Sequence, residues 1–139
     1  AKAEARSWPS VVVDGGAAGT QTAQVSGLPQ YLNATLVSNA QTAQAQPSTA
    51  RVTVFEHPST GTTTVNTDIK AYASRDNGTT YTQVTLIDDG EYESGKKLLS
   101  GSADISGQPA GTSMRYKIET LNQSSGKITR LHGVSLQWA

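Results

Sequence analysis

Cysteine is absent from this chain of 139 residues. The absence excludes disulfide bridges, thiolate catalysis and zinc sites with sulfur ligands. An excess of charge of either sign is also missing, because 11 Lys and Arg residues balance 11 Asp and Glu residues. A neutral chain lacks the basic surface of a nucleic-acid-binding protein and any strong attraction to anionic lipids. We therefore expect no nucleic-acid partner.

Long apolar runs and helical stripes are missing too. No stretch approaches the roughly 18 apolar residues of a membrane-spanning helix, so we expect no membrane insertion. What the chain offers instead is alternation: Met114, Tyr116 and Ile118 are separated by charged residues, the period-2 pattern of a half-buried strand. Seven to nine such short strands with turns between them predict an all-β fold, an antiparallel β-sandwich of jelly-roll-like type.

The first third of the chain differs from the rest in composition. Gln, Thr, Ala, Ser and Gly dominate up to residue 50, and clear strand patterns follow from there. We predict an N-terminal arm or linker over residues 1–20 and a single β-sandwich domain over residues 21–139. The predicted strands of the second half are 51–55, 66–73, 81–87, 96–105, 114–120 and a last one that ends at Trp138.

The strongest turn signal lies between two of these strands, at residues 74–81. The Asp carboxylate can accept from backbone N–H groups just downstream, while Asn and Gly tolerate the positive φ of a tight turn. The spacing resembles the Asp-box, a hairpin motif of sialidase propellers and many unrelated β proteins, where it is a folding device remote from the catalytic site. The predicted structural hairpin turn comprises Ser74, Asp76, Asn77, Gly78 and Tyr81.

The densest acidic cluster is formed by Asp88, Asp89, Glu91 and Glu93. Paired carboxylates could hydrolyse a glycosidic bond or bind calcium. The cluster lacks the order of an EF-hand loop, so a metal site is left unknown, with Asp88 and Asp89 as its candidate ligands. A solvated turn at residues 88–90 explains the cluster more simply, because turns are rich in Asp and Gly.

Catalytic constellations are not apparent. His57 precedes Pro58 in a predicted loop, His132 lies in the predicted last strand, and no Gly-x-Ser-x-Gly elbow accompanies either histidine. No glycine-rich loop has the ending that cradles a phosphate. We expect a protein that is not an enzyme and uses no cofactor. A small glycan hydrolase acting through the carboxylates of residues 88–93 is the enzymatic alternative.

Aromatic residues suggest a ligand contact. Tyr92 lies in the stretch Gly-Glu-Tyr-Glu-Ser-Gly, and a Tyr exposed on a polar β surface can stack on a sugar ring. We predict Tyr92, with Glu91 and Glu93 beside it, as the ligand-contact residues. Phe55, Tyr116 and Trp138 are expected in the core instead, because they lie in alternating patterns.

Several phrases of the second half carry a resemblance to a known family. They are Ser74–Leu86, Ile87–Tyr92, Lys96–Leu99, Asp104–Tyr116 and Leu131–Trp138. In this order, residues 66–139 resemble a module at the C-termini of tail-fibre and other structural proteins of tailed bacteriophages. The resemblance implies a β-rich, non-enzymatic and usually oligomeric virion component that contacts the host surface. It implies no particular binding residues.

The resemblance and the weakly charged surface together predict a bacteriophage virion structural protein. We expect a tail-fibre or similar appendage domain on the particle surface, forming a homotrimer, contacting other virion proteins and attaching to host-surface polysaccharide. Two alternatives stay open. One is a capsid decoration or head-fibre protein that docks on the shell through its N-terminal part, and the other is a free-standing carbohydrate-binding module.

Overall fold

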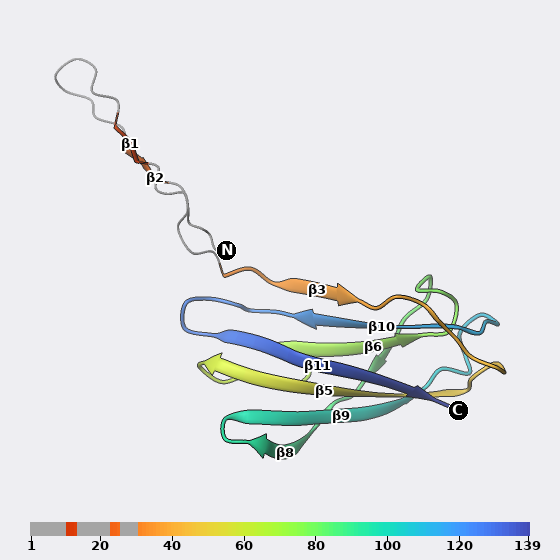
Figure 1. Cartoon of the computed structure of the whole chain (residues 1–139). Coiled ribbons are helices and arrows are strands. Elements are labelled where there is room, and N and C mark those ends of the chain that lie inside the picture. Colours follow the sequence, from red (N-terminus) through yellow and green to blue (C-terminus); the bar gives the residue numbers. More distant parts are fainter. Residues whose placement is uncertain (1–10, 14–22, 26–30) are drawn as a thin grey trace. The chain divides into compact units, whose positions relative to one another are not determined.

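The computed structural model describes residues 11–13, 23–25 and 31–139, and these residues form strands, turns and loops but no helix (Figure 1). Accordingly, none of the described residues belongs to a helix that could cross a membrane. The chain divides into two compact units, Ala1–Tyr31 and Leu32–Ala139. In the first unit, β1 (Val11–Val13) pairs with β2 (Ala23–Val25) in an antiparallel ladder. The second unit contains strands β3 to β11 and the candidate site.

One sheet of the second unit has the strand order β3–β10–β6–β7, and β4 pairs with the start of β10. All pairs of neighbouring strands in this sheet are antiparallel. The alternation predicted for the central strand is present, because Met114 and Ile118 are buried while Arg115 and Lys117 are half-buried on the opposite face. Its strands are β3 (Ala34–Val37), β4 (Gln41–Thr42), β6 (Ile69–Ser74), β7 (Thr82–Val84) and β10 (Ser113–Thr120).

The other sheet has the order β11–β5–β9–β8 and is also antiparallel throughout. The long central strand β5 (Thr49–Thr60) lies between β11 (Ile128–Trp138) and β9 (Lys96–Asp104). The edge strand β8 (Ile87–Glu93) has exposed residues along its whole length.

The two sheets pack face to face, with β10 against β11, β6 against β5 and β7 against β9. The fold is therefore an antiparallel β-sandwich, as the alternating sequence pattern predicts. Each fully buried aliphatic side chain of its core contributes about 1.5–3 kcal/mol relative to exposure. The core side chains, none more than 1% exposed, include Val52, Val54, Ile69, Ala71, Ala73, Val84, Leu99, Ile105, Met114 and Ile118.

The packing between the sheets depends on Gly101 of β9. A Cβ atom at this position would lie 2.0 Å from the carbonyl oxygen of Thr85, in the chain segment that crosses from β7 to β8. Real Cβ atoms do not approach backbone oxygens this closely. Only glycine therefore allows the crossing segment to lie against β9.

The orientation of Phe55 differs from the prediction. Val52 and Val54 point into the core, and by the alternation of the strand Glu56 points inward as well while Phe55 lies on the outer face. The prediction of a core position for Phe55 was wrong, because the parity set by the two valines decides the face. Trp138 and Tyr116 do pack against the core, although both are only partly buried.

Two predicted loop segments also lie within strands. Residues 88–90 form part of β8, where the pairing with β9 shifts register, and the hairpin turn comes later, at Ser94 and Gly95. An edge strand tolerates such a bulge because only one of its sides must pair. His57 belongs to β5, which continues past Pro58 to Thr60. Proline is accepted there because the pairing of β5 with β9 has already ended at Glu56.

Candidate functional site

The candidate site lies on the outer face of the sheet β11–β5–β9–β8, around Phe55. The ladder places Phe55 between Leu98 of β9 and Gly133 of β11. Gly133 has no side chain, and even a Cβ at that position would only just touch the Phe55 ring, at 3.5 Å. One side of the ring is therefore not covered by β11.

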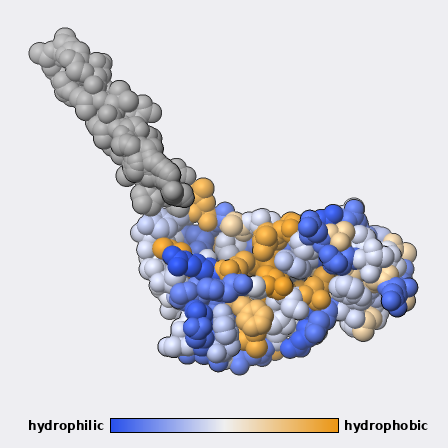
Figure 2. All heavy atoms as spheres, viewed as in Figure 1, coloured by the Kyte–Doolittle hydropathy of each residue, from blue (hydrophilic) through white to orange (hydrophobic). Residues whose placement is uncertain are grey.

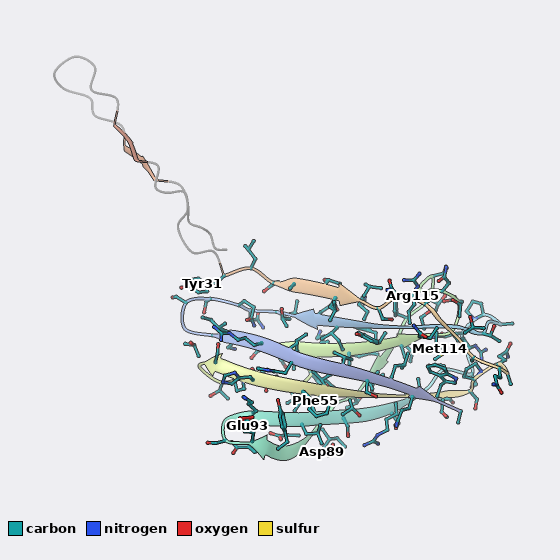
Figure 3. The ribbon with its side chains drawn as sticks, in the orientation of Figure 1. Tyr31, Phe55, Asp89, Glu93, Met114 and Arg115 are labelled. Atoms are coloured by element: carbon teal, nitrogen blue, oxygen red, sulfur yellow. The ribbon has the colours of Figure 1, made fainter. Side chains whose placement is uncertain are left out.

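Tyr92 packs against Phe55 from the edge strand β8. Their ring centroids lie 5.2 Å apart and the ring planes meet at 84°, an edge-to-face contact. This geometry is favourable for aromatic pairs and is worth about 0.5–1.5 kcal/mol beyond the buried area. Tyr92 remains 43% exposed. Figure 3 shows Phe55 in the middle of this sheet, with Glu93 toward one end of it.

Polar groups surround the aromatic pair. The rings of His57 and His132 lie 5.5 Å apart on the neighbouring strands β5 and β11. Glu93 accepts a 2.7 Å ion-pair contact from Lys96 across the β8–β9 turn. That hydrogen bond, with smaller contributions from the two nearby histidines, lowers the pKa of Glu93 below its ordinary value. Glu93 is thus an ionised acceptor at neutral pH.

The predicted contact residues come together only in part. Tyr92 and Glu93 join the aromatic and histidine groups, whereas Glu91 is an exposed residue opposite Lys97 in the bulged part of the ladder. Sequence reasoning missed Phe55, His57 and His132 as members of this face. The inward positions of Val52 and Val54 could have placed Phe55 and His57 on the outer face of β5. No local sequence signal, however, indicates that β11 lies beside β5. We call the group of Phe55, His57, Tyr92, Glu93 and His132 the aromatic platform.

The candidate metal ligands have protein partners. Asp88 accepts from Lys97 Nζ at 2.6 Å and from the Gly90 backbone N–H at 2.9 Å, and these two bonds lower its pKa. Asp89 accepts a hydrogen bond from the Ser100 hydroxyl. Within the described part of the chain, no three His, Asp or Glu side chains cluster as metal ligands.

The turn at residues 74–81 connects β6 to β7 in the opposite sheet. Ser74 Oγ donates to Asp76 Oδ1 at 2.7 Å and accepts from the Gly78 backbone N–H at 2.8 Å. Asp76 Oδ1 also accepts from the Thr80 N–H at 2.8 Å. Burial would raise the pKa of Asp76, but the bonds from Thr80 and Ser74 lower it. Positive φ angles occur at Asn77 (62°) and Gly78 (84°), and the Tyr81 hydroxyl lies against Gly78.

A second feature of the surface is a hollow beside Trp138. It has a volume of about 430 Å³ and is lined by residues with uncharged side chains. Sequence reasoning did not find it, because the loop that faces Trp138 is remote in sequence. The lining residues are Thr42, Ala43, Gln44, Ala45, Gln46, Trp138 and Ala139.

Comparison of the chain with protein-family models, with curated proteins and with solved structures finds no match in any of the three.

Proposed function

We propose that this chain is a structural domain of a bacteriophage virion, from a tail fibre or similar appendage, that attaches to host-surface polysaccharide. The observation that carries the binding half of the proposal is the aromatic platform. An exposed tyrosine held edge-on by a phenylalanine offers an apolar surface for the C–H face of a sugar ring. The ionised Glu93 and the two imidazoles offer acceptors and donors for its hydroxyl groups.

The virion half of the proposal is supported by the resemblance of residues 66–139 to the phage module. A domain on the particle surface is present in several copies, as a homotrimer and beside other virion proteins. Several weak sugar contacts then act together, so that a shallow platform gives useful avidity. The proposed domain acts without catalysis, and Asp88 and Glu93 are engaged in ion pairs with Lys97 and Lys96.

The proposal is tested by binding to an array of bacterial capsular and lipopolysaccharide glycans. We expect the wild-type chain to retain particular glycans and Tyr92→Ala to weaken the apparent affinity by at least tenfold, about 1.4 kcal/mol. Ile87→Ala is the matched control, because Ile87 lies on the same strand and is 64% exposed. We expect this control to bind like the wild type.

The outcomes separate the candidates. No retained glycan, or equal binding by Tyr92→Ala and the wild type, would reject the platform as an attachment site. Release of free sugar from a bound polysaccharide, lost when Asp88, Asp89, Glu91 and Glu93 are all replaced by Ala, would instead favour the hydrolase. Binding to purified capsids rather than to glycans would favour the decoration protein.

A further inference from the structure

One long side of the sandwich lacks a strand. In the first sheet β10 packs against β11, which is the last strand of the second sheet. The neighbour of β10 in the first sheet is β3, so β3 extends past the edge of the second sheet. On this side, β3 and β11 each have a free edge among the described residues. Figure 1 shows the two strands running in the same direction.

Side chains that should be covered are therefore exposed on this side. Val52 and Val54 of β5 are 0% exposed, but the inward side chains of β11 beside them are only partly buried. On β3, Leu36 pairs with the buried Ile118 and shares its inward face, yet it is 44% exposed. Figure 2 shows hydrophobic residues gathered between β3 and β11. We call this surface the open edge; its side chains are Leu36, Leu131, Val134, Leu136 and Trp138.

The open edge carries almost no charge. No charged side chain occurs in residues 31–50 or 133–139, which contain β3, β4 and most of β11. The opposite edge strand, β8, carries four carboxylates instead. Charged residues are a usual device that keeps a sheet edge from pairing with another chain. The device is present on β8 and missing from β3.

We propose that the open edge is the surface through which copies of this chain assemble, with β3 of each copy beside β11 of its neighbour. The two sheets are offset by one strand, so the sheet that ends with β11 has no strand opposite β3. A second copy related by an axis parallel to the strands places its own β3 in that position, beside β11. The same contact covers Leu36 and the inward side chains of β11. Because β3 and residues 133–138 of β11 carry no charged side chain, a second copy paired along them buries no unpaired charge.

This inference rests on the oligomeric state in the proposed function but not on glycan binding. The aromatic platform lies on the outer face of the sheet, whereas the open edge consists of inward side chains. Assembly is therefore measured without sugar, so that a failure of assembly and a failure of glycan binding are distinguishable.

The test is the solution mass of the whole 139-residue chain by light scattering on a size-exclusion column. One chain has a mass of 14.6 kDa. We expect a mass well above this value, and three times this value for the proposed homotrimer. Leu36→Lys places a charge on the open edge and should give a single-chain mass. Ile87→Lys places the same charge on the opposite edge, where Ile87 is 64% exposed, and should keep the wild-type mass.

Three results would overturn the proposal: a wild-type chain that is monomeric, an assembly that survives Leu36→Lys, or one that Ile87→Lys dissociates equally. If Leu36→Lys proves unfolded by circular dichroism, Leu36→Ser decides instead. A folded Leu36→Ser should dissociate at least tenfold more readily than the wild type, and an unchanged dissociation constant would count against the interface.

A fluorescence measurement gives an independent readout. When Trp8 is replaced by Phe, Trp138 is the single tryptophan, and it lies on the open edge. Its emission should shift to shorter wavelength as the protein concentration rises through the dissociation constant, because assembly removes water from the ring. An emission that does not change across the association would place the interface elsewhere.

Discussion

The two ends of the sandwich are both closed by buried charged side chains, but their hydrogen bonding differs. Asp68 directly precedes β6 and Arg75 directly follows it, so the two residues lie at opposite ends of one core strand. Arg75 is 4% exposed and has backbone carbonyls as its partners. It donates to Pro47 at 2.7 Å, Ser106 at 2.8 Å and Pro109 at 3.0 Å, and also to Gln108.

The other end contains two buried carboxylates. Asp68 is 1% exposed and accepts from Lys127 Nζ at 2.6 Å, Asn122 Nδ2 at 2.8 Å and the Thr64 backbone N–H at 2.8 Å. Glu56 is equally buried, but only its Oε1 has a partner, the Thr63 hydroxyl at 2.6 Å. Its second oxygen, Oε2, has no hydrogen-bond partner.

The difference shows what makes an interior charge stabilising. The guanidinium of Arg75 connects two loop segments, one at Pro47 and one at residues 106–109, through donors that point at their carbonyl oxygens. Asp68 does the same with three donors aimed at one carboxylate. Glu56 has the same burial without the same number of partners, so its ionised form carries a cost of desolvation. Burial alone therefore does not decide whether a charged side chain stabilises or destabilises the fold.

Replacement of Arg75 should have the largest effect. Arg75→Met keeps the length and packing of the side chain but leaves four loop carbonyls without their donor, so we expect a loss of about 3–5 kcal/mol in the free energy of unfolding. Denaturant titration measures this loss. Arg51→Met is the control, since Arg51 is exposed and should change stability by less than about 1 kcal/mol. A loss below about 1 kcal/mol for Arg75→Met would contradict the proposed role.

Replacement of Asp68 should have an intermediate effect that depends on pH. Burial alone would raise the pKa of Asp68, but the bonds from Lys127, Asn122 and Thr64 outweigh it and lower the pKa from 3.8 to about 2. A lowered pKa stabilises the fold above pH 4, and this contribution is lost as the pH falls toward 2. The shift corresponds to about 2 kcal/mol.

We therefore expect Asp68→Asn to lose about 2 kcal/mol at pH 7 and to approach the wild type near pH 2. Thermal unfolding at a series of pH values follows this convergence. Glu91→Gln is the control, because Glu91 is an exposed residue of the edge strand β8. A difference between Asp68→Asn and the wild type that stays constant with pH would show that the ion pair is not its cause.

The sequence predicts the strands of this fold better than their ends. The alternation of Met114, Tyr116 and Ile118 predicts β10 because one-sided burial imposes a period of two. The guanidinium of Arg75 could not be predicted, because its partners Pro47 and Ser106 lie about thirty residues away on either side and only the folded loops bring them together. The turn residues around Arg75 predict the backbone conformation of Arg75, but they do not predict the partners of its side chain.

The candidate site is predictable to the same extent. Tyr92 and Glu93 are recognisable from one short polar segment, since a Tyr among Gly, Glu and Ser is rarely a core residue. Phe55 was misplaced because it is the apolar neighbour of a charged Glu56, and both residues occupy the face opposite to the one their chemistry favours. His132 joins His57 only through the register of β11 on β5, which links positions 75 residues apart and leaves no local pattern.

Replacement of Glu56 should have the smallest effect, and one of opposite sign. Desolvation raises the pKa of Glu56, and the Thr63 hydrogen bond and Lys97 offset this only in part. A raised pKa means that the folded state binds the proton more tightly than the unfolded state, so ionisation of Glu56 costs stability as the pH rises through the raised value. Glu56→Gln removes the charge and still accepts from Thr63. We expect a gain of about 1 kcal/mol at pH 7.5.

The gain should vanish at pH 4, where Glu56 is protonated and resembles the neutral amide. Thermal unfolding of Glu56→Gln and the wild type at both pH values measures it. Glu56→Ala is the comparison variant, because it removes the charge together with the Thr63 contact and leaves a void between β5 and the Thr63 loop. If Glu56→Gln were as destabilised as Glu56→Ala at pH 7.5, the ionised carboxylate of Glu56 would be stabilising. The two ends of the sandwich would then differ only in which groups bond to their buried charges.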